Sequence, residues 1–509
     1  MLYSLLAVGL VLLLWVLTSL SDNLLKIEAE KSGIDTEKSD IGIFPKLGSI
    51  TAPKAPSFVK GKFHKLKKGF DIKLKGAASP SINSNARATR FSIQPPNFRG
   101  ISPIPKVIVA EGDEVKAGEV IFFDKKNPEV KYVSPVSGEI VEVRRGAKRA
   151  ITDVIILADK QMDYHIYDYP NVDSCTREEL AETMAATGLW TLLNQRPYDI
   201  TPGINDVPAN IFISTFDTSP LAPDSNLLIA GKEKAFQKGL DVLNKLTVGR
   251  VFLGLDGNNN SPSVFSDATG VEKNYFSGKH PAGNVGVQIH HTAPIRKETV
   301  WTVGIQEVAT IGELFISGRI DMSRVVAMTG TGIVKPSYVS TYVGAQIGDL
   351  LKGNLVNDDM RLVAGNVLSG KQVTQEDFLN YHDKQITTLA EGNYNEMFGW
   401  LLPLAPRPSA SKTFPGFLMP NFEYEADTNT HGEKRAFVVT GQYEKVLPMD
   451  IYPQHLMKAI LANNIERMEG LGINELSEED VALCEFVCTS KQPLQSILRK
   501  GLDMMREQS

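Results

Sequence analysis

At 509 residues the chain is too long for a single hydrophobic core, and it is expected to form about three or four domains. A formal net charge of −5, without a basic arm carrying interleaved aromatic residues, argues against a nucleic-acid partner. The three cysteines, Cys175, Cys484 and Cys488, are too few for a disulfide framework and fit a reducing compartment such as the cytoplasm.

The first expected element is an apolar run from Leu2 to Leu20 that carries no charged side chain. At about 1.5 Å per residue this run is just long enough to span the hydrocarbon of a membrane. We therefore predict a transmembrane anchor, and a cleaved signal peptide is the alternative, although the positive n-region of such peptides is absent. Three lysines follow the run and place the rest of the chain in the cytoplasm: Lys26, Lys31 and Lys38.

Between Val107 and Ile156, short apolar runs alternate with charged residues and are interrupted by glycines, which predicts brief strands joined by tight turns. Gly112, Gly118 and Gly138 stand where a small barrel would turn its corners. This stretch resembles the barrel-sandwich hybrid of biotinyl and lipoyl carrier domains. The lysines at the expected hairpin tip, Lys125 and Lys126, are followed at once by Asn127-Pro128, so we expect an unmodified structural barrel rather than a lipoylated one.

Strands then alternate with helices. A helix is expected from Arg177 to Thr187, a strand over 209–216, a helix from Glu233 to Leu246 and a strand over 250–254. This order predicts a parallel sheet of the nucleotide-binding type. The glycine-rich phosphate loop of such sheets is missing, because its nearest counterpart, 330–335, lacks the third glycine and the Walker spacing and is more typical of a hairpin turn.

The part of the chain after residue 300 is more varied. A strand at 301–303, a helix over 306–316 and further strands up to residue 367 suggest a β-grasp. Beyond it we expect an irregular, strand-rich connector, then a helix from His455 to Met468 and a helix that begins at the capping box Ser477–Asp480. The predicted order is a 1–21 anchor, a 22–60 tether, a 61–160 barrel-sandwich hybrid, a 161–298 Rossmann-like domain, a 299–375 β-grasp domain, a 376–450 connector and a 451–509 helical domain.

Several short segments, in matching order from about Leu66 to the C-terminus, closely resemble the NqrA family, which belongs to the sodium-translocating NADH:quinone reductase. The matching segments are Lys68–Ile72, Phe123–Pro128, Arg145–Arg149, Gly188–Thr191 with Arg196-Pro197, Asp217–Ala222, His280–Gly283, Val367–Lys371, Phe398–Trp400, Gln442–Lys445 and Cys484–Cys488. The family normally begins near Lys65, so the resemblance says nothing about residues 1–60.

The resemblance also implies relatives that carry redox cofactors, namely the cluster-binding subunit of the Rnf complex and the flavin-binding subunit of complex I. In those relatives a run of glycines forms a flavin and NADH cradle, whereas this chain has Trp190 and Leu192 in the corresponding segment, 188–197. Cys484 and Cys488 alone cannot complete a four-thiolate iron–sulfur site. His290-His291 has no cysteine or carboxylate at ligand spacing. We therefore predict no cofactor, metal ion or catalytic residue in this chain.

The fold class we predict is α/β and multidomain, with a lipoyl-like barrel-sandwich hybrid, a degenerate Rossmann-like domain, an SLBB-like β-grasp, C-terminal helices and an N-terminal transmembrane helix. The resemblance implies a protein on the cytoplasmic side of the bacterial inner membrane, associated with the quinone-reducing end of its complex. NADH, FAD, FMN, riboflavin and iron–sulfur centres are expected on the other subunits, which are its partners. Residues suited to a quinone headgroup near the strand ends are Phe216, Asp217, His280 and His290.

Two alternatives to this function stay open. In the first, the chain is a scaffold that holds the complex together without touching quinone, and the four residues only shape an interface with other subunits. In the second, it is an Rnf-like electron-transfer protein that binds flavin and iron–sulfur clusters.

Overall fold

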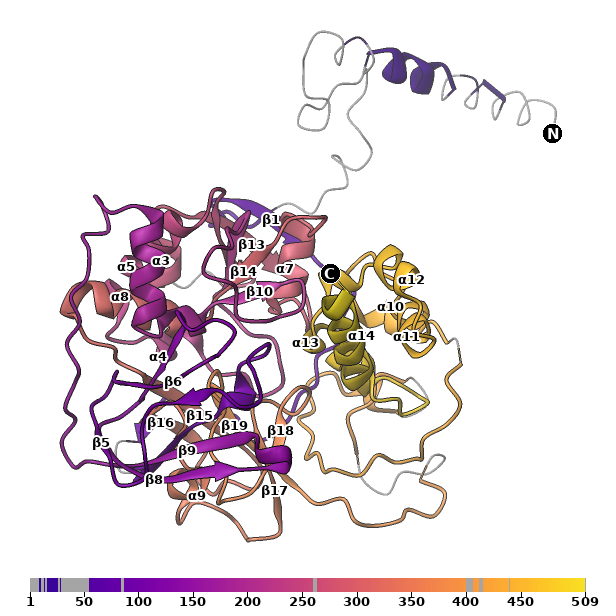
Figure 1. Cartoon of the computed structure of the whole chain (residues 1–509). Helices are drawn as coiled ribbons and strands as arrows, with labels where there is room; N and C mark the ends of the chain where they lie inside the picture. Colours follow the sequence, from indigo (N-terminus) through magenta and orange to yellow (C-terminus); the bar gives the residue numbers. More distant parts are fainter. Residues whose placement is uncertain are drawn as a thin grey trace. The chain divides into compact units, whose positions relative to one another are not determined.

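The computed structural model describes residues 9, 10, 13, 16–25, 28, 55–83, 87–259, 263–399, 406–411, 415–438 and 440–508. The chain divides into two compact units, Met1–Ser57 and Phe58–Ser509. In the first unit the described residues between 9 and 28 are helical (Figure 1). No helix among the residues that the structure describes is long and apolar enough to cross a membrane. Much of the predicted anchor, 1–21, lies outside these residues.

Two small sheets form the barrel near the start of the second unit. One has the strand order β3-β9-β8-β5 and the other β4-β6-β7. Their bounds are β3 Arg90–Ile93, β4 Lys106–Val107, β5 Glu114–Val115, β6 Val120–Phe123, β7 Lys131–Val133, β8 Gly138–Arg145 and β9 Ile151–Ala158, with short 3₁₀ turns η1 Pro95–Asn97 and η2 Ala147–Arg149. Gly112, Gly118 and Gly138 all have positive φ, and a Cβ on Gly138 would collide with the carbonyl of Leu157. The predicted corner glycines are therefore confirmed.

A six-stranded sheet with the order β1-β13-β12-β11-β14-β10 forms the second layer of the fold. All neighbouring strands are parallel except β10 and β14. The strands are β1 Lys62–Lys65, β10 Asn194–Arg196, β11 Asn210–Ser214, β12 Val251–Asp256, β13 Glu272–Ser277 and β14 Val300–Thr302. The helices are α3 Arg177–Ala186, α4 Ser225–Leu228, α5 Glu233–Leu246, α6 Val264–Asp267, α7 Val285–Thr292 and α8 Ile305–Ser317, with η3 Leu189–Leu192. Strand order reverses between β11 and β14, because β12 and β13 extend one side of β11 and β14 the other.

Helices α5 and α8 pack closely on each other. A Cβ on Gly239 would collide with the carbonyl of Val308, and a Cβ on Gly312 with that of Ala235, so both glycines permit the close approach of the two backbones. This packing differs from the β-grasp expectation, which assigned the strand at 301–303 and the helix over 306–316 to the following domain. That assignment is wrong, because β14 forms hydrogen bonds with β11 in the parallel sheet and α8 covers the same layer.

A second six-stranded sheet has the order β18-β17-β19-β15-β16-β2. Its strands are β2 Ile82–Asn83, β15 Ser323–Gly330, β16 Ser337–Tyr342, β17 Met360–Ala364, β18 Lys371–Val373 and β19 Gln385–Ala390, and α9 is Ile347–Leu351. Strands β15 and β16 are antiparallel neighbours, with 330–335 in the connection between them. The prediction of a hairpin turn there, rather than a phosphate loop, is confirmed.

The C-terminal residues form a cluster of helices with its own hydrophobic core (Figure 1, yellow). They are α10 Tyr443–Val446, α11 Pro453–Leu461, α12 Ile465–Gly470, η5 Ile473–Glu475, α13 Glu478–Phe486 and α14 Leu494–Gln508. The helix expected from His455 to Met468 is broken, because Asn463 has positive φ and Asn464 caps α12. Between Glu391 and Val446, where strands were expected, the described residues form only η4 Pro415–Leu418, α10 and isolated bridges.

Candidate functional site

A cavity of about 490 Å³ opens at the carboxyl ends of the parallel strands, beside the point where strand order reverses. Ser214 at the end of β11 and Thr302 at the end of β14 both line it. In open α/β sheets this crevice is where ligands bind, because the two loops that leave neighbouring strands diverge there. The topology therefore makes this cavity the candidate functional site, although no sequence motif marks it.

Three of the four residues predicted to contact quinone lie in the wall of this cavity: Phe216, Asp217 and His280. Phe216 and Asp217 follow β11, and His280 precedes α7. The fourth, His290, lies outside the cavity wall. It lies on α7, where its Nδ1 is 2.6 Å from Glu475 Oε2 and its Nε2 accepts a hydrogen bond from the backbone of Asp450. His290 therefore joins α7 to the C-terminal helices, and its assignment to the quinone group is not supported by its position.

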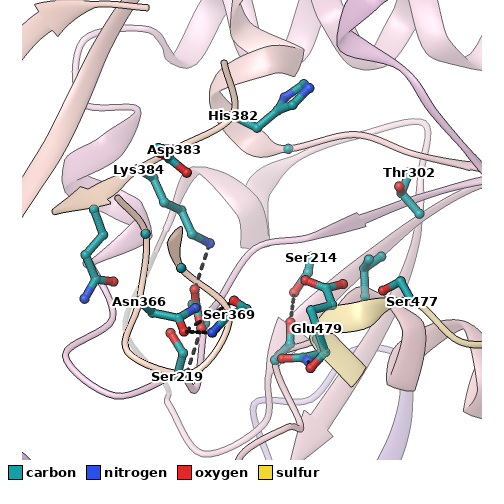
Figure 2. A pocket seen from close by; sticks show the side chains of 18 of the residues that line it. Ser214, Ser219, Thr302, Asn366, Ser369, His382, Asp383, Lys384, Ser477 and Glu479 are labelled. Carbon is teal, nitrogen blue, oxygen red and sulfur yellow. Dashed lines mark hydrogen bonds and ion pairs between the residues drawn. The ribbon is translucent and has the colours of Figure 1, made fainter. Parts of the chain in front are cut away.

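Asp217 is held by an ion pair that joins the two six-stranded sheets. Lys384, which directly precedes β19, places its Nζ 2.8 Å from Asp217 Oδ2 (Figure 2). The backbone of Ser219 also donates to Asp217 Oδ1. Burial alone would favour the protonated acid, but the charge and hydrogen bond of Lys384 outweigh it and hold the pKa of Asp217 well below its usual range. Asp217 is an anion at neutral pH.

His280 is 4% exposed, and burial lowers its pKa. Its Nδ1 lies 3.1 Å from Thr218 Oγ1, which already accepts a hydrogen bond from the backbone of Gly283. Within the described part of the chain, Nε2 has no hydrogen-bond partner. The wall of the cavity thus contains a buried, neutral histidine.

The C-terminal helices supply the opposite wall. Arg196, at the end of β10 and with a side chain only 3% exposed, forms ion pairs with Glu479 (3.1 Å) and Asp480 (3.2 Å), and lies 3.7 Å from Asp199. Glu479, next to Asp480 in α13, also lies in the wall of the cavity (Figure 2). Burial and the neighbouring charge of Asp480 raise the pKa of Glu479, although Arg196 opposes this shift. Glu479 is therefore more readily protonated than an ordinary glutamate.

Sequence reasoning did not find Lys384, Arg196 or Glu479, although all three form the site. A signal existed for two of them, because Arg196-Pro197 belongs to a segment that matches the family and Glu479 lies inside the capping box of α13. Neither pattern shows that the side chain faces a cavity. The loop after β17 contributes Asn366 and Ser369, whose side chains are hydrogen-bonded to each other (Figure 2).

The buried cysteines lie away from this cavity. Tyr443 and Cys488 are hydrogen-bonded at 2.9 Å in the core of the C-terminal helices, and burial raises the pKa of Cys484. A buried, protonated thiol is a poor metal ligand and nucleophile. The residues that the structure describes contain no group of three or more His, Cys, Asp or Glu side chains that could hold a metal ion.

These features define a multidomain α/β protein with a ligand-sized cavity between its domains. Three family models match successive parts of it: the NqrA N-terminal barrel-sandwich hybrid domain at residues 64–159, the NqrA second alpha/beta domain at 175–320 and the NqrA C-terminal SLBB domain at 325–375. The chain belongs to the NqrA family, whose members are subunits of the Na⁺-translocating NADH-quinone reductases.

Similar proteins include two NqrA subunits of Na⁺-translocating NADH-quinone reductases. The protein of Vibrio atlanticus (strain LGP32) is 36% identical over 447 residues, which are 87% of this chain and 99% of the relative. That of Alcanivorax borkumensis (strain ATCC 700651 / DSM 11573 / NCIMB 13689 / SK2) is 38% identical over 443 residues, 86% of this chain and 98% of the relative. An air-oxidized NAD⁺-reducing [NiFe]-hydrogenase structure matches with a TM-score of 0.34 at 10% identity, over 68% of this chain and 67% of that chain, which is too low to establish a common fold.

Proposed function

We propose that this chain is the NqrA subunit of a Na⁺-translocating NADH:quinone reductase and that it serves the quinone end of the complex. The relatives that carry this name match nearly their whole length to it. Electron carriers, namely FAD, FMN, riboflavin and iron–sulfur centres, reside on the partner subunits in this proposal. The bulk of the chain lies on the cytoplasmic side of the bacterial inner membrane, and residues 1–21 anchor it.

The single observation that supports a quinone role is the cavity at the strand reversal, whose wall contains Phe216, Asp217 and His280. A quinone headgroup needs an apolar face to stack on and hydrogen-bond donors for its two carbonyl oxygens. Phe216 offers the first. The imidazole of His280, which lines the cavity, and the protonated form of Glu479 offer the second.

The lack of a glycine-rich phosphate loop supports the proposal that this chain binds no flavin or nicotinamide nucleotide. The α/β domain is, in this view, a nucleotide-binding fold that has lost its cradle, since Leu189, Trp190 and Leu192 are buried in the core where a cradle would need backbone access. The other domain boundaries predicted from the sequence, apart from the one between residues 298 and 299, remain part of the same proposal.

A photoreactive quinone analogue tests the quinone role in the purified whole complex. We expect label on the peptides around Phe216 and His280, and less of it in the His280→Ala variant. His455→Ala, a change at an exposed residue of α11, is the matched control. Label confined to other subunits would leave the scaffold function in place of the quinone role. A purified chain with flavin or iron–sulfur absorbance would instead favour the Rnf-like alternative.

A further inference from the structure

Two helix N-termini border the cavity. Gly304 and Ile305, at the start of α8, and Asn284 and Val285, at the start of α7, all line it. In α/β folds such N-termini attract phosphate groups, because their free N–H groups and the helix dipole favour negative charge. The contacts at these two helices decide which ligands the cavity accepts.

The N-terminus of α8 is already occupied by a carboxylate of the chain. Glu307 is the third residue of α8, and a Cβ added to Gly304 would collide with Glu307 Oε2, so the carboxylate lies directly over the first turn. Arg324 donates to Glu307 Oε1 at 3.3 Å. Burial opposes ionisation, but the charges of Arg324 and His382 outweigh it and hold the pKa of Glu307 at about 2. A full negative charge therefore occupies the place that a phosphate would take.

A carboxylate also lies at the N-terminus of α7. A Cβ on Gly286, in the first turn of α7, would collide with Asp480 Oδ2. Asp480 is 1% exposed and is fixed by hydrogen bonds from Ser477 and Arg196. The side chain of Asn284 adds a hydrogen bond to the backbone of Glu479. The carboxylate of Asp480, in the first turn of α13, therefore lies against the first turn of α7.

The charges in the rest of the wall also disfavour an anion. Six acidic side chains line the cavity, whereas the lysines and arginines that line it number four. Three of these cations are already paired: Lys384 with Asp217, Arg99 with Asp199 and Glu478, and Arg196 with the carboxylates of α13. A phosphate entering here would meet carboxylates, while most of the lining cations are already engaged by carboxylates of the chain.

We infer that Glu307 and Asp480 are specificity-determining residues. Their carboxylates occupy the N-termini of α8 and α7 and so exclude phosphate groups from both. The cavity then accepts uncharged ligands that carry hydrogen-bond acceptors. Within the proposed function, on which the choice of ligand rests, this selects a quinone headgroup and rejects nucleotides. Glu479 and Lys384 lie in the wall of the same cavity, which Figure 2 shows from close by.

The test measures binding of two probes, inorganic pyrophosphate and ubiquinone-1, to the full-length purified chain. We expect wild type to bind ubiquinone-1 and to show no measurable affinity for pyrophosphate. Glu307→Gln keeps the shape of the side chain and removes its charge, and it is expected to raise the affinity for pyrophosphate at least tenfold. Glu182→Gln, at an exposed position of α3, is the control and should change neither affinity.

The outcomes separate this inference from the proposed function. Pyrophosphate binding to wild type with affinity equal to that for ubiquinone-1 overturns the inference, as does a folded Glu307→Gln variant that gains no pyrophosphate affinity. If Glu307→Gln gains pyrophosphate affinity while wild type binds no ubiquinone-1, anion exclusion stands and the quinone role fails. Should Glu307→Gln not fold, the wild-type comparison of the two probes decides alone.

Discussion

Lys384 Nζ and Asp217 Oδ2 lie 2.8 Å apart and join the loop after β11 to the strand β19 of the other six-stranded sheet. The two residues are 167 positions apart in the sequence. Asp217 is 14% exposed and Lys384 45%, so water screens the pair mainly from the lysine side. Their contact links the two sheets at the cavity.

Asp217→Asn should lower the free energy of unfolding by about 1–2 kcal/mol. This cost lies between those of exposed and buried ion pairs, because Lys384 is partly exposed to water whereas Asp217 is mostly buried. Urea unfolding measures it. The control is Glu425→Gln, which removes the exposed pair with Lys75 and should cost less than about 0.5 kcal/mol. Equal effects of the two changes would contradict the view that burial gives the Asp217 pair its strength.

Arg196→Met should destabilise the fold more strongly, by about 3 kcal/mol or more. Removing this guanidinium leaves Asp480 and its neighbours as uncompensated buried charge. Arg196→Lys should not restore stability, because an ammonium group cannot address two carboxylates with the planar geometry of arginine. Arg250→Gln, which breaks an exposed pair with Glu272, serves as the control in the same denaturation series. Full rescue by lysine would show that only the charge matters here.

Stability should fall in acid partly through Glu307. Its pKa is held at about 2 in the folded chain, below the ordinary value of 4.5, so the unfolded chain takes up a proton first as the pH falls. The contribution of Glu307 is complete above about pH 4.5 and is lost as the pH approaches 2. Denaturant titrations across this range should give a shallower slope for Glu307→Gln than for wild type. Identical slopes would mean that Glu307 titrates normally in the folded protein.

Gly239→Ala should cost about 1–3 kcal/mol or more, since its Cβ would press against the carbonyl of Val308 where α5 and α8 meet. Gly470→Ala is the matched control, because a Cβ there meets no other atom within 4 Å. Alanine is also the better helix former, so this change should be neutral or stabilising by up to about 1 kcal/mol. Thermal unfolding of the two variants distinguishes close packing from a general effect of glycine replacement.

The anchor predicted at residues 1–21 has a direct test. The full chain should stay with membranes after a carbonate wash, and a variant that lacks residues 1–57 should be released from membranes when expressed without partner subunits. The truncated chain should still fold, because residues 58–509 form a compact unit of their own. Release of the full chain by carbonate would show that the apolar run does not insert.

Local sequence signals predicted the elements that local interactions define. The helix Glu233–Leu246 has the bounds expected from its apolar periodicity, and the capping box that Thr176 and Glu179 form fixes the start of α3. The corner glycines of the barrel were recognisable for the same reason, since positive φ is a property of one residue. Such features depend on neighbours a few positions away.

Long-range pairing explains most of what the sequence did not predict. The strand Val300–Thr302 carries no signal for which sheet it joins, and its assignment to the wrong domain followed from chain order alone. His290 was grouped with His280 because both are near strand ends in the sequence. His290 instead lies within α7, and its side chain contacts Glu475. The cavity wall likewise combines Arg196, Lys384 and Glu479, which no local pattern relates.

The assembly of the cavity wall from the parallel sheet, the second sheet and the C-terminal helices has a thermodynamic consequence. Docking of α13 and binding of a ligand in the cavity are thermodynamically linked. If docked α13 raises the affinity for the ligand by some factor, the bound ligand raises the equilibrium constant for docking of α13 by the same factor. A contact made or lost by the C-terminal helices at the surface would then change ligand affinity inside the protein, without any change in the residues that touch the ligand.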